Sequence, residues 1–177
     1  MEREKDWSAK KITRIALAMA VVCVSTMAIQ IPIPLGYMHL GNCCILLISV
    51  YSDPVTGALS AGIGSALADL LTGYPQWIVP TLVIKGIMGF AIARIAKQKG
   101  HKAKLITFRT FISTIVGILI MIVGYTIFGA ILYGSIPTGV AQIPGLSIEG
   151  ILGGVLFYFV GFIGERGKVF KLADDKK

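Results

Sequence analysis

WIVPTLVIKGIMGFAIARIA, residues 77–96, is the stretch that decides the fold. Its 20 residues match the length of a helix that crosses a hydrocarbon core of about 30 Å. Its only charged residues are Lys85 and, near its end, Arg94. An ammonium group in the middle of such a helix costs roughly 2.5–3.5 kcal/mol on insertion scales. Lys85 therefore needs a partner at that depth, either another protein group or a ligand.

The composition extends this interpretation to the whole chain of 177 residues, which is 55% hydrophobic and 15% charged. Soluble domains carry about 25% charged residues. We therefore predict an all-α integral membrane protein with a single domain over residues 1–177, because the apolar segments leave no room for a soluble domain. The predicted spans are residues 11–30, 40–51, 54–72, 77–96, 108–133 and 145–163. The second is short, with a reach of only about 18–24 Å at helical rise.

The basic residues predict the topology. Apart from Lys85, the 17 lysines and arginines fall within residues 1–14, 94–109 and 166–177. By the positive-inside rule all three clusters face the cytoplasm. An even number of crossings between clusters then gives a six-transmembrane-helix bundle, with both termini cytoplasmic. The first span also resembles a secretory signal, but the even count requires it as a helix.

The net charge of +8 is explained by this topology and by attraction to anionic lipid. No nucleic-acid-binding motif is visible, so we expect no nucleic-acid partner. The cysteines lie in apolar surroundings without metal-ligand spacing, so we expect no disulfide, metal site or cofactor.

Two features predict how the helices are arranged. Asp53 before Pro54 is typical of a helix start. Small residues such as Gly57, Ala61 and Ser65 recur on several faces of residues 54–72 and let helix backbones approach closely. This helix should therefore lie at the centre of the bundle.

Polar and aromatic residues gather near the predicted outer ends of the helices, above Lys85. We predict a pocket that opens outward and binds a small molecule. The alternatives are structural: Asp69 or Glu149 neutralises Lys85, Tyr74 and Trp77 anchor a helix at the membrane interface, and His39 is a loop residue. The candidate substrate-binding residues are Lys85, His39, Asn42, Asp69, Trp77, Tyr74 and Glu149.

Several segments together resemble the substrate-binding S components of energy-coupling factor (ECF) vitamin transporters, in the riboflavin-type branch. That branch also includes components for pyridoxine and for the hydroxymethyl-pyrimidine precursor of thiamine. The segments that carry the likeness are His39-Leu40-Gly41-Asn42, Asp53-Pro54-Val55-Thr56-Gly57-Ala58, Asp69-Leu70-Leu71 and Pro80-Thr81-Leu82-Val83-Ile84-Lys85-Gly86.

The resemblance implies a location in the bacterial cell membrane and high-affinity capture of a vitamin at the outer face, under the first outer loop. It also implies association with a transmembrane coupling protein and two cytoplasmic ATPases, with Ala16 and Ala20 contacting the coupling protein. The chain has no phosphate-binding P-loop sequence, so the ATPase must be a separate subunit.

We therefore expect a non-enzymatic S component, with pyridoxine as the favoured vitamin because one cation and one acceptor suit its phenol and hydroxymethyl groups. The hydroxymethyl-pyrimidine and riboflavin stay open as substrates. Two other classes of protein are also open: a self-sufficient small permease, and a membrane-embedded enzyme that uses His39 with Glu149 or Asp69 as acid and base.

Overall fold

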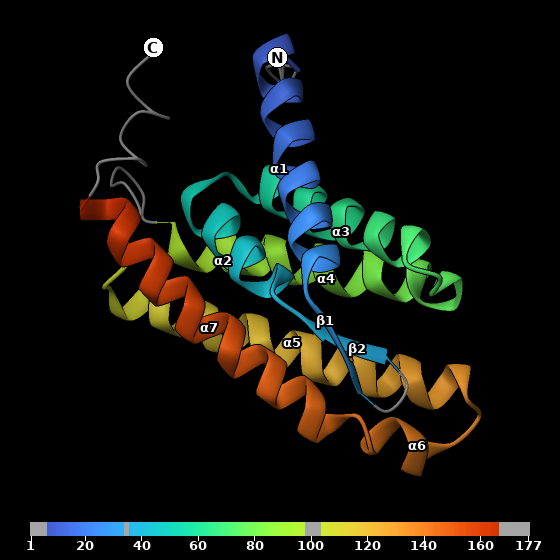
Figure 1. Ribbon diagram of the computed structural model, residues 1–177. Helices are drawn as coiled ribbons and strands as arrows, with labels where there is room; N and C mark the ends of the chain where they lie inside the picture. The colour runs from blue at the N-terminus through green and yellow to red at the C-terminus, as the bar shows by residue number, and fades with distance from the viewer. Residues whose placement is uncertain (1–6, 34–35, 98–103, 167–177) are drawn as a thin grey trace, which may run out of the picture.

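The computed structural model describes residues 7–33, 36–97 and 104–166. Within these ranges the chain is helical apart from one two-stranded antiparallel hairpin (Figure 1). The elements are α1 (Ala9–Ala28), β1 (Gln30–Ile33), β2 (Gly36–His39), α2 (Gly41–Tyr51), α3 (Pro54–Leu71), the 3-10 helix η1 (Pro75–Trp77), α4 (Ile78–Ala96), α5 (Phe108–Leu132), α6 (Ile136–Val140) and α7 (Ile143–Arg166).

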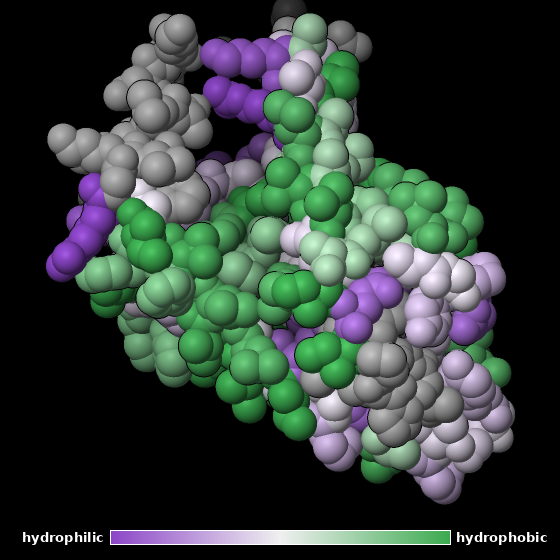
Figure 2. Space-filling model, viewed as in Figure 1, coloured by the Kyte–Doolittle hydropathy of each residue, from purple (hydrophilic) through white to green (hydrophobic). Residues whose placement is uncertain are grey.

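Helices occupy all six segments predicted as spans, and five helical stretches in the described residues are long and apolar enough to cross a membrane. The exception is α2, whose 11 residues reach only about 16 Å. Figure 2 shows hydrophobic side chains over much of the helical surface, and hydrophilic ones at the start of α1, at the end of α7 and over the other end of the bundle, near the hairpin and α6. The fold is therefore an all-helical, multi-pass membrane protein.

The helix α4 packs against α3 on one side and α5 on the other (Figure 1). At Gly57 of α3 and Gly89 of α4 the two backbones come so close that a Cβ on either glycine would overlap the carbonyl group of the other. Of the five spans, α3 has the largest buried share, 56%. Its small residues thus have the packing role that their spacing predicts.

The short helix α2 lies among four longer ones, because it contacts α1, α3, α4 and α7. Its buried side chains include Ile45 and Leu46 in the core and Asn42 near its first turn. It ends just before the cap of α3, where the Asp53 carboxylate accepts hydrogen bonds from the backbone N–H groups of Val55 and Thr56 at 3.1 and 3.2 Å. The helix α2 is too short to cross a membrane. It lies among the longer helices and places the polar side chain of Asn42 in the core.

The segment between the first two predicted spans, which contains Pro32 and Pro34 and which we expected to be an outer loop, includes the β1–β2 hairpin, with Gln30 opposite His39 and Ile31 opposite Met38. Pro32 is tolerated because each strand of a two-stranded ribbon has one unpaired edge, and a residue without an N–H can sit there. The hairpin connects α1 to α2 and brings His39 against α7, whose first turns contact β2.

Candidate functional site: the buried Lys85 cluster

One face of the η1–α4 segment carries the site. Trp77, Thr81 and Lys85 follow one another at intervals of four residues, so their side chains lie along one side of the helix. All three are buried, and Lys85 is only 1% exposed. An ammonium group at this depth must be matched by polar groups from neighbouring helices.

The ammonium of Lys85 has three kinds of partner. Its Nζ donates a hydrogen bond of 2.6 Å to Oδ1 of Asn42 on α2, and lies 3.3 Å from the thioether sulfur of Met121 on α5. It also lies 5.4 Å from the ring centroid of Tyr125, a cation–π distance. Groups from two helices, α2 and α5, therefore contact the cation.

Glu149 of α7 supplies the negative charge. Its Oε1 lies 3.8 Å from Nζ of Lys85 and accepts a hydrogen bond of 2.7 Å from Nδ2 of Asn42. Asn42 thus bridges the two charges, with its oxygen on the cation and its nitrogen on the anion. All three side chains are buried, so the charges are matched inside the protein and not by water.

His39 joins the hairpin to this group. Its Nε2 lies 3.4 Å from Oε1 of Glu149, while its Nδ1 accepts a hydrogen bond of 3.0 Å from the backbone N–H of Gly41. Burial first, and then the nearby charge of Lys85, lower the pKa of His39 well below its usual range. The imidazole is therefore neutral, with its proton on Nε2 facing the carboxylate.

An aromatic wall adjoins the cation. The Trp77 ring lies 5.5 Å from that of Tyr125 and 6.3 Å from that of Tyr133. The hydroxyls of Tyr125 and Thr81 are 3.0 Å apart. The indole N–H of Trp77 is buried without a hydrogen-bond partner among the described residues. The side chain of Trp77 is thus packed inside the bundle.

The structure brings four of the predicted residues into direct contact: Lys85, Asn42, Glu149 and His39. Together with Met121 and Tyr125, which also contact Lys85, they form the Lys85 cluster. Trp77 adjoins them through Tyr125. The other two predicted residues are placed differently. Asp69 is buried in α3, whereas Tyr74 is half-buried in the turn that follows, where its backbone N–H donates to the carbonyl of Asp69 at 2.9 Å.

Sequence reasoning missed Met121, Tyr125 and Thr81. A signal for all three exists: Met121 and Tyr125 are four residues apart on α5, as are Thr81 and Lys85 on α4, so each pair lies on one side of its helix. Nothing in the sequence places these pairs opposite each other. Among residues 7–33, 36–97 and 104–166, no group of three acidic, histidine or cysteine side chains is arranged to hold a metal ion.

The cluster offers a buried set of donors and acceptors beside flat aromatic rings. Lys85, Asn42 and neutral His39 present N–H groups, Glu149 presents carboxylate oxygens, and Tyr125 presents a ring face. In this structure the polar groups satisfy one another. A polar, planar molecule can replace some of these contacts and gain charge-assisted hydrogen bonds in a water-poor site.

Comparisons with known proteins agree with this picture. A solved structure described as "Structure and mechanism of the S component of a bacterial ECF transporter" superposes with a TM-score of 0.67 at 21% identity, covering 85% of this chain and 92% of that one. This likeness shows the fold. A protein of Pyrococcus woesei, named only as an uncharacterized protein in a gap 3' region, is 36% identical over 151 residues, 79% of this chain and 97% of the relative.

The family comparison is the most specific. Residues 6–165 match the model of the family described as the ECF-type riboflavin transporter, S component. The match covers most of the chain, including every residue of the Lys85 cluster. The chain therefore belongs to the S-component family of ECF-type riboflavin transporters, and it is a membrane transport subunit and not an enzyme.

Proposed function

We propose that this S component captures a small water-soluble vitamin at the Lys85 cluster, for uptake powered by separate ATPase subunits. The observation that carries the proposal is the ammonium of Lys85, 1% exposed, held by Asn42 and Glu149 beside an aromatic wall. A purely structural ion pair gains little in a membrane core, because desolvation offsets much of the attraction. We therefore assign the buried pair of Lys85 and Glu149 a role in binding a ligand.

Pyridoxine is the substrate that this set of groups suits best. Its ionisable phenol matches Lys85, its hydroxymethyl groups match Glu149 and Asn42, and its ring can lie against Tyr125 or Trp77. The hydroxymethyl-pyrimidine precursor of thiamine offers an amine in place of the phenol. Riboflavin is supported by the name of the matched family and would require the cluster to open further.

Substrate identity is tested first by mass spectrometry of the small molecule that co-purifies with the chain. Calorimetry with pyridoxine, hydroxymethyl-pyrimidine and riboflavin then ranks the three candidates. Pyridoxine should bind most tightly and compete with the co-purified molecule. If riboflavin or the hydroxymethyl-pyrimidine binds more tightly than pyridoxine, the substrate is that molecule and the proposed site is unchanged. If none of the three binds, the proposal that the site takes one of these vitamins is wrong.

A separate surface supports association with a transmembrane coupling protein and two cytoplasmic ATPases. Ala16 and Ala20 of α1 are exposed on one side of the helix, next to exposed Leu17 and Val21. Small side chains on an exposed face allow close approach of another helix. We assign this face of α1 to the coupling protein, in a topology that places both chain termini in the cytoplasm.

The docking assignment predicts different effects on binding and on uptake. Ala16→Leu with Ala20→Leu should leave vitamin affinity unchanged but reduce uptake and co-purification of the ATPases by about tenfold. Val123→Phe, on the exposed face of α5, is the matched control and should change neither. Loss of vitamin binding in the α1 variant would contradict the assignment, and uptake by the chain alone in liposomes would identify a self-sufficient permease instead.

A further inference from the structure

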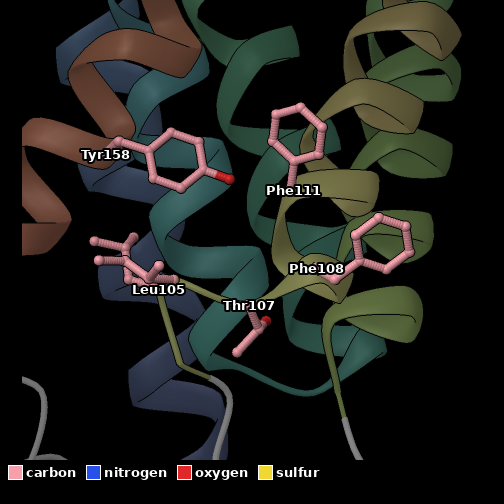
Figure 3. A pocket seen from close by; sticks show the side chains of 6 residues that line it. Leu105, Thr107, Phe108, Phe111 and Tyr158 are labelled. Atoms are coloured by element: carbon pink, nitrogen blue, oxygen red, sulfur yellow. The ribbon is translucent and has the colours of Figure 1, made fainter.

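A pocket of about 360 Å³ opens at the end of the bundle where α5 begins, away from the hairpin (Figure 3). Its walls come from the segment just before α5, from the first turn of α5 and from α7. The lining residues are Leu105, Ile106, Thr107, Phe108, Phe111 and Tyr158. None of these residues belongs to the Lys85 cluster.

The inner wall of this pocket is fixed by contacts to two helices. The backbone N–H of Leu105 donates a hydrogen bond of 2.8 Å to Oε1 of Glu165 on α7, and the hydroxyl of Tyr51 on α2 donates to the same oxygen at 2.8 Å. The Leu105 side chain is 1% exposed and packs so closely on Gly161 that no Cβ fits there. The segment before α5 is therefore anchored, and the hollow beside it is part of the fold.

The outer wall is apolar and faces outward. Ile106 and Phe108 are 76% and 78% exposed, and Phe111 is 52% exposed. Large apolar side chains at the start of a membrane helix are suited to contact with lipid acyl chains. Figure 3 shows the Tyr158 hydroxyl directed into the space between Phe111 and Leu105. Its oxygen is buried and has no hydrogen-bond partner among the described residues.

Two basic residues are next to lining residues of the pocket in the chain. Lys104 precedes the pocket and Arg109 lies in the first turn of α5, and both side chains are exposed. The first turn of a long helix adds the positive end of its dipole, since its backbone N–H groups have no partner within the helix. An apolar hollow, a hydroxyl directed into it and two exposed cations adjacent in the chain to its lining residues match the parts of an anionic phospholipid.

We propose that this pocket binds one anionic phospholipid molecule. An acyl chain lies along Phe108 and Phe111, the headgroup phosphate pairs with Lys104 and Arg109, and the Tyr158 hydroxyl donates to an oxygen of the glycerol backbone. Glu165 of α7 holds both Tyr51 of α2 and the backbone of Leu105 beside the pocket, so such a lipid stabilises this end of the bundle. The proposal is independent of which vitamin the Lys85 cluster binds.

The test is native mass spectrometry of the full chain in detergent, titrated with phosphatidylglycerol or with phosphatidylcholine of the same acyl chains. The wild-type chain should retain one phosphatidylglycerol about tenfold more tightly than phosphatidylcholine. Lys104→Gln with Arg109→Gln should remove that preference. Tyr158→Phe, which keeps the ring and its packing, should weaken retention of phosphatidylglycerol about threefold.

The matched control is Lys10→Gln with Arg14→Gln, which removes the same charge from the start of α1 and should leave the preference intact. If both double variants lose the preference for phosphatidylglycerol equally, the preference reflects general attraction between the basic protein and anionic lipid, and the proposed site is wrong. Equal binding of the two lipids by the wild-type chain would overturn it as well. Unchanged phosphatidylglycerol binding, with loss of the coupling protein from the Lys104 and Arg109 variant, would assign the pocket to a protein partner instead.

Discussion

The Nζ of Lys85 and the Oε1 of Glu149 lie 3.8 Å apart, too far for a good hydrogen bond, and both hydrogen-bond to the amide of Asn42 at 2.6 and 2.7 Å. The two charges are thus held apart by a neutral side chain. Each keeps hydrogen-bonding capacity that a direct, short ion pair would use up. A ligand can enter such a cluster by replacing the amide, without separating a tight ion pair.

Lys85→Met tests the role of the cation. We expect vitamin affinity to fall by about tenfold or more, as the loss of a charge-assisted hydrogen bond implies. We also expect stability to fall by about 3 kcal/mol, because Glu149 is left as an unpaired buried charge. Calorimetry measures the first effect, and the unfolding temperature in detergent measures the second.

The matched variant is Lys85→Met with Glu149→Gln, which removes both charges. Its unfolding temperature should return most of the way to the wild-type value, while vitamin binding stays lost. Normal binding by this double variant would show that the ion pair is structural and that the ligand contacts other groups.

His39→Gln tests the link between hairpin and site through pH. The pKa of His39 is lower in the folded protein than in the unfolded chain, where it is near 6.5. At pH values between the two pKa values, the unfolded chain binds a proton that the folded protein does not. The wild-type chain should therefore lose stability as pH falls from about 7 toward 5, since protonation of Nδ1 breaks its bond from Gly41. Unfolding temperatures across this pH range are the measurement.

The control is His101→Gln, which removes the other histidine of the chain. It should keep the loss of stability at low pH, whereas His39→Gln should reduce it. The interpretation fails if the two variants show the same dependence on pH.

Tyr125→Leu tests the aromatic wall. Loss of the ring removes the cation–π contact with Lys85 and one surface for stacking, which together should weaken vitamin binding by about threefold to tenfold. Tyr125→Phe keeps the ring and loses only the hydroxyl contact with Thr81. It should bind within about twofold of the wild-type chain, and equal losses in the two variants would assign the role to the hydroxyl.

Gly89→Ala tests the contact between α3 and α4. A Cβ there overlaps the backbone of Gly57, so we expect a loss of about 1–3 kcal/mol from forced separation of the helices. Gly86→Ala is the control on the same helix, because its Cβ would meet only the carbonyl of Ala58 at 3.7 Å, an ordinary contact. It should be neutral or slightly stabilising. Similar unfolding temperatures for the two variants would contradict this account of the packing.

The positions of the helices followed from the sequence because apolar length and caps are local properties. The pattern predicts a helix over 54–72 and the structure has α3 at Pro54–Leu71, with Asp53 as its cap. The internal position of α2 could not be predicted, because it depends on contacts with four helices distant in sequence. The hairpin was missed because two prolines suggest a loop, and pairing between strands is not visible in either strand alone.

The residues of the candidate site likewise include some that the sequence could identify and some that it could not. Lys85, Glu149 and Asn42 stand out in sequence because a polar group in an apolar helix is costly, and the structure places them together. Met121 and Tyr125 do not stand out, since a thioether and an aromatic ring are ordinary in a core. Their contact with Lys85 follows from how α5 is rotated against α4, which the sequence pattern leaves undetermined. That these residues bind the vitamin stays a prediction.

A single residue, Ile29, separates the last turn of α1 from β1. The hairpin that carries His39 therefore follows directly on the helix that carries Ala16 and Ala20, with only the backbone dihedral angles of Ile29 between them. If the hairpin lifts to admit a molecule, α1 must tilt or lose its final turn. A partner protein bound to α1 would then contact a helix whose tilt differs between the empty and the filled site.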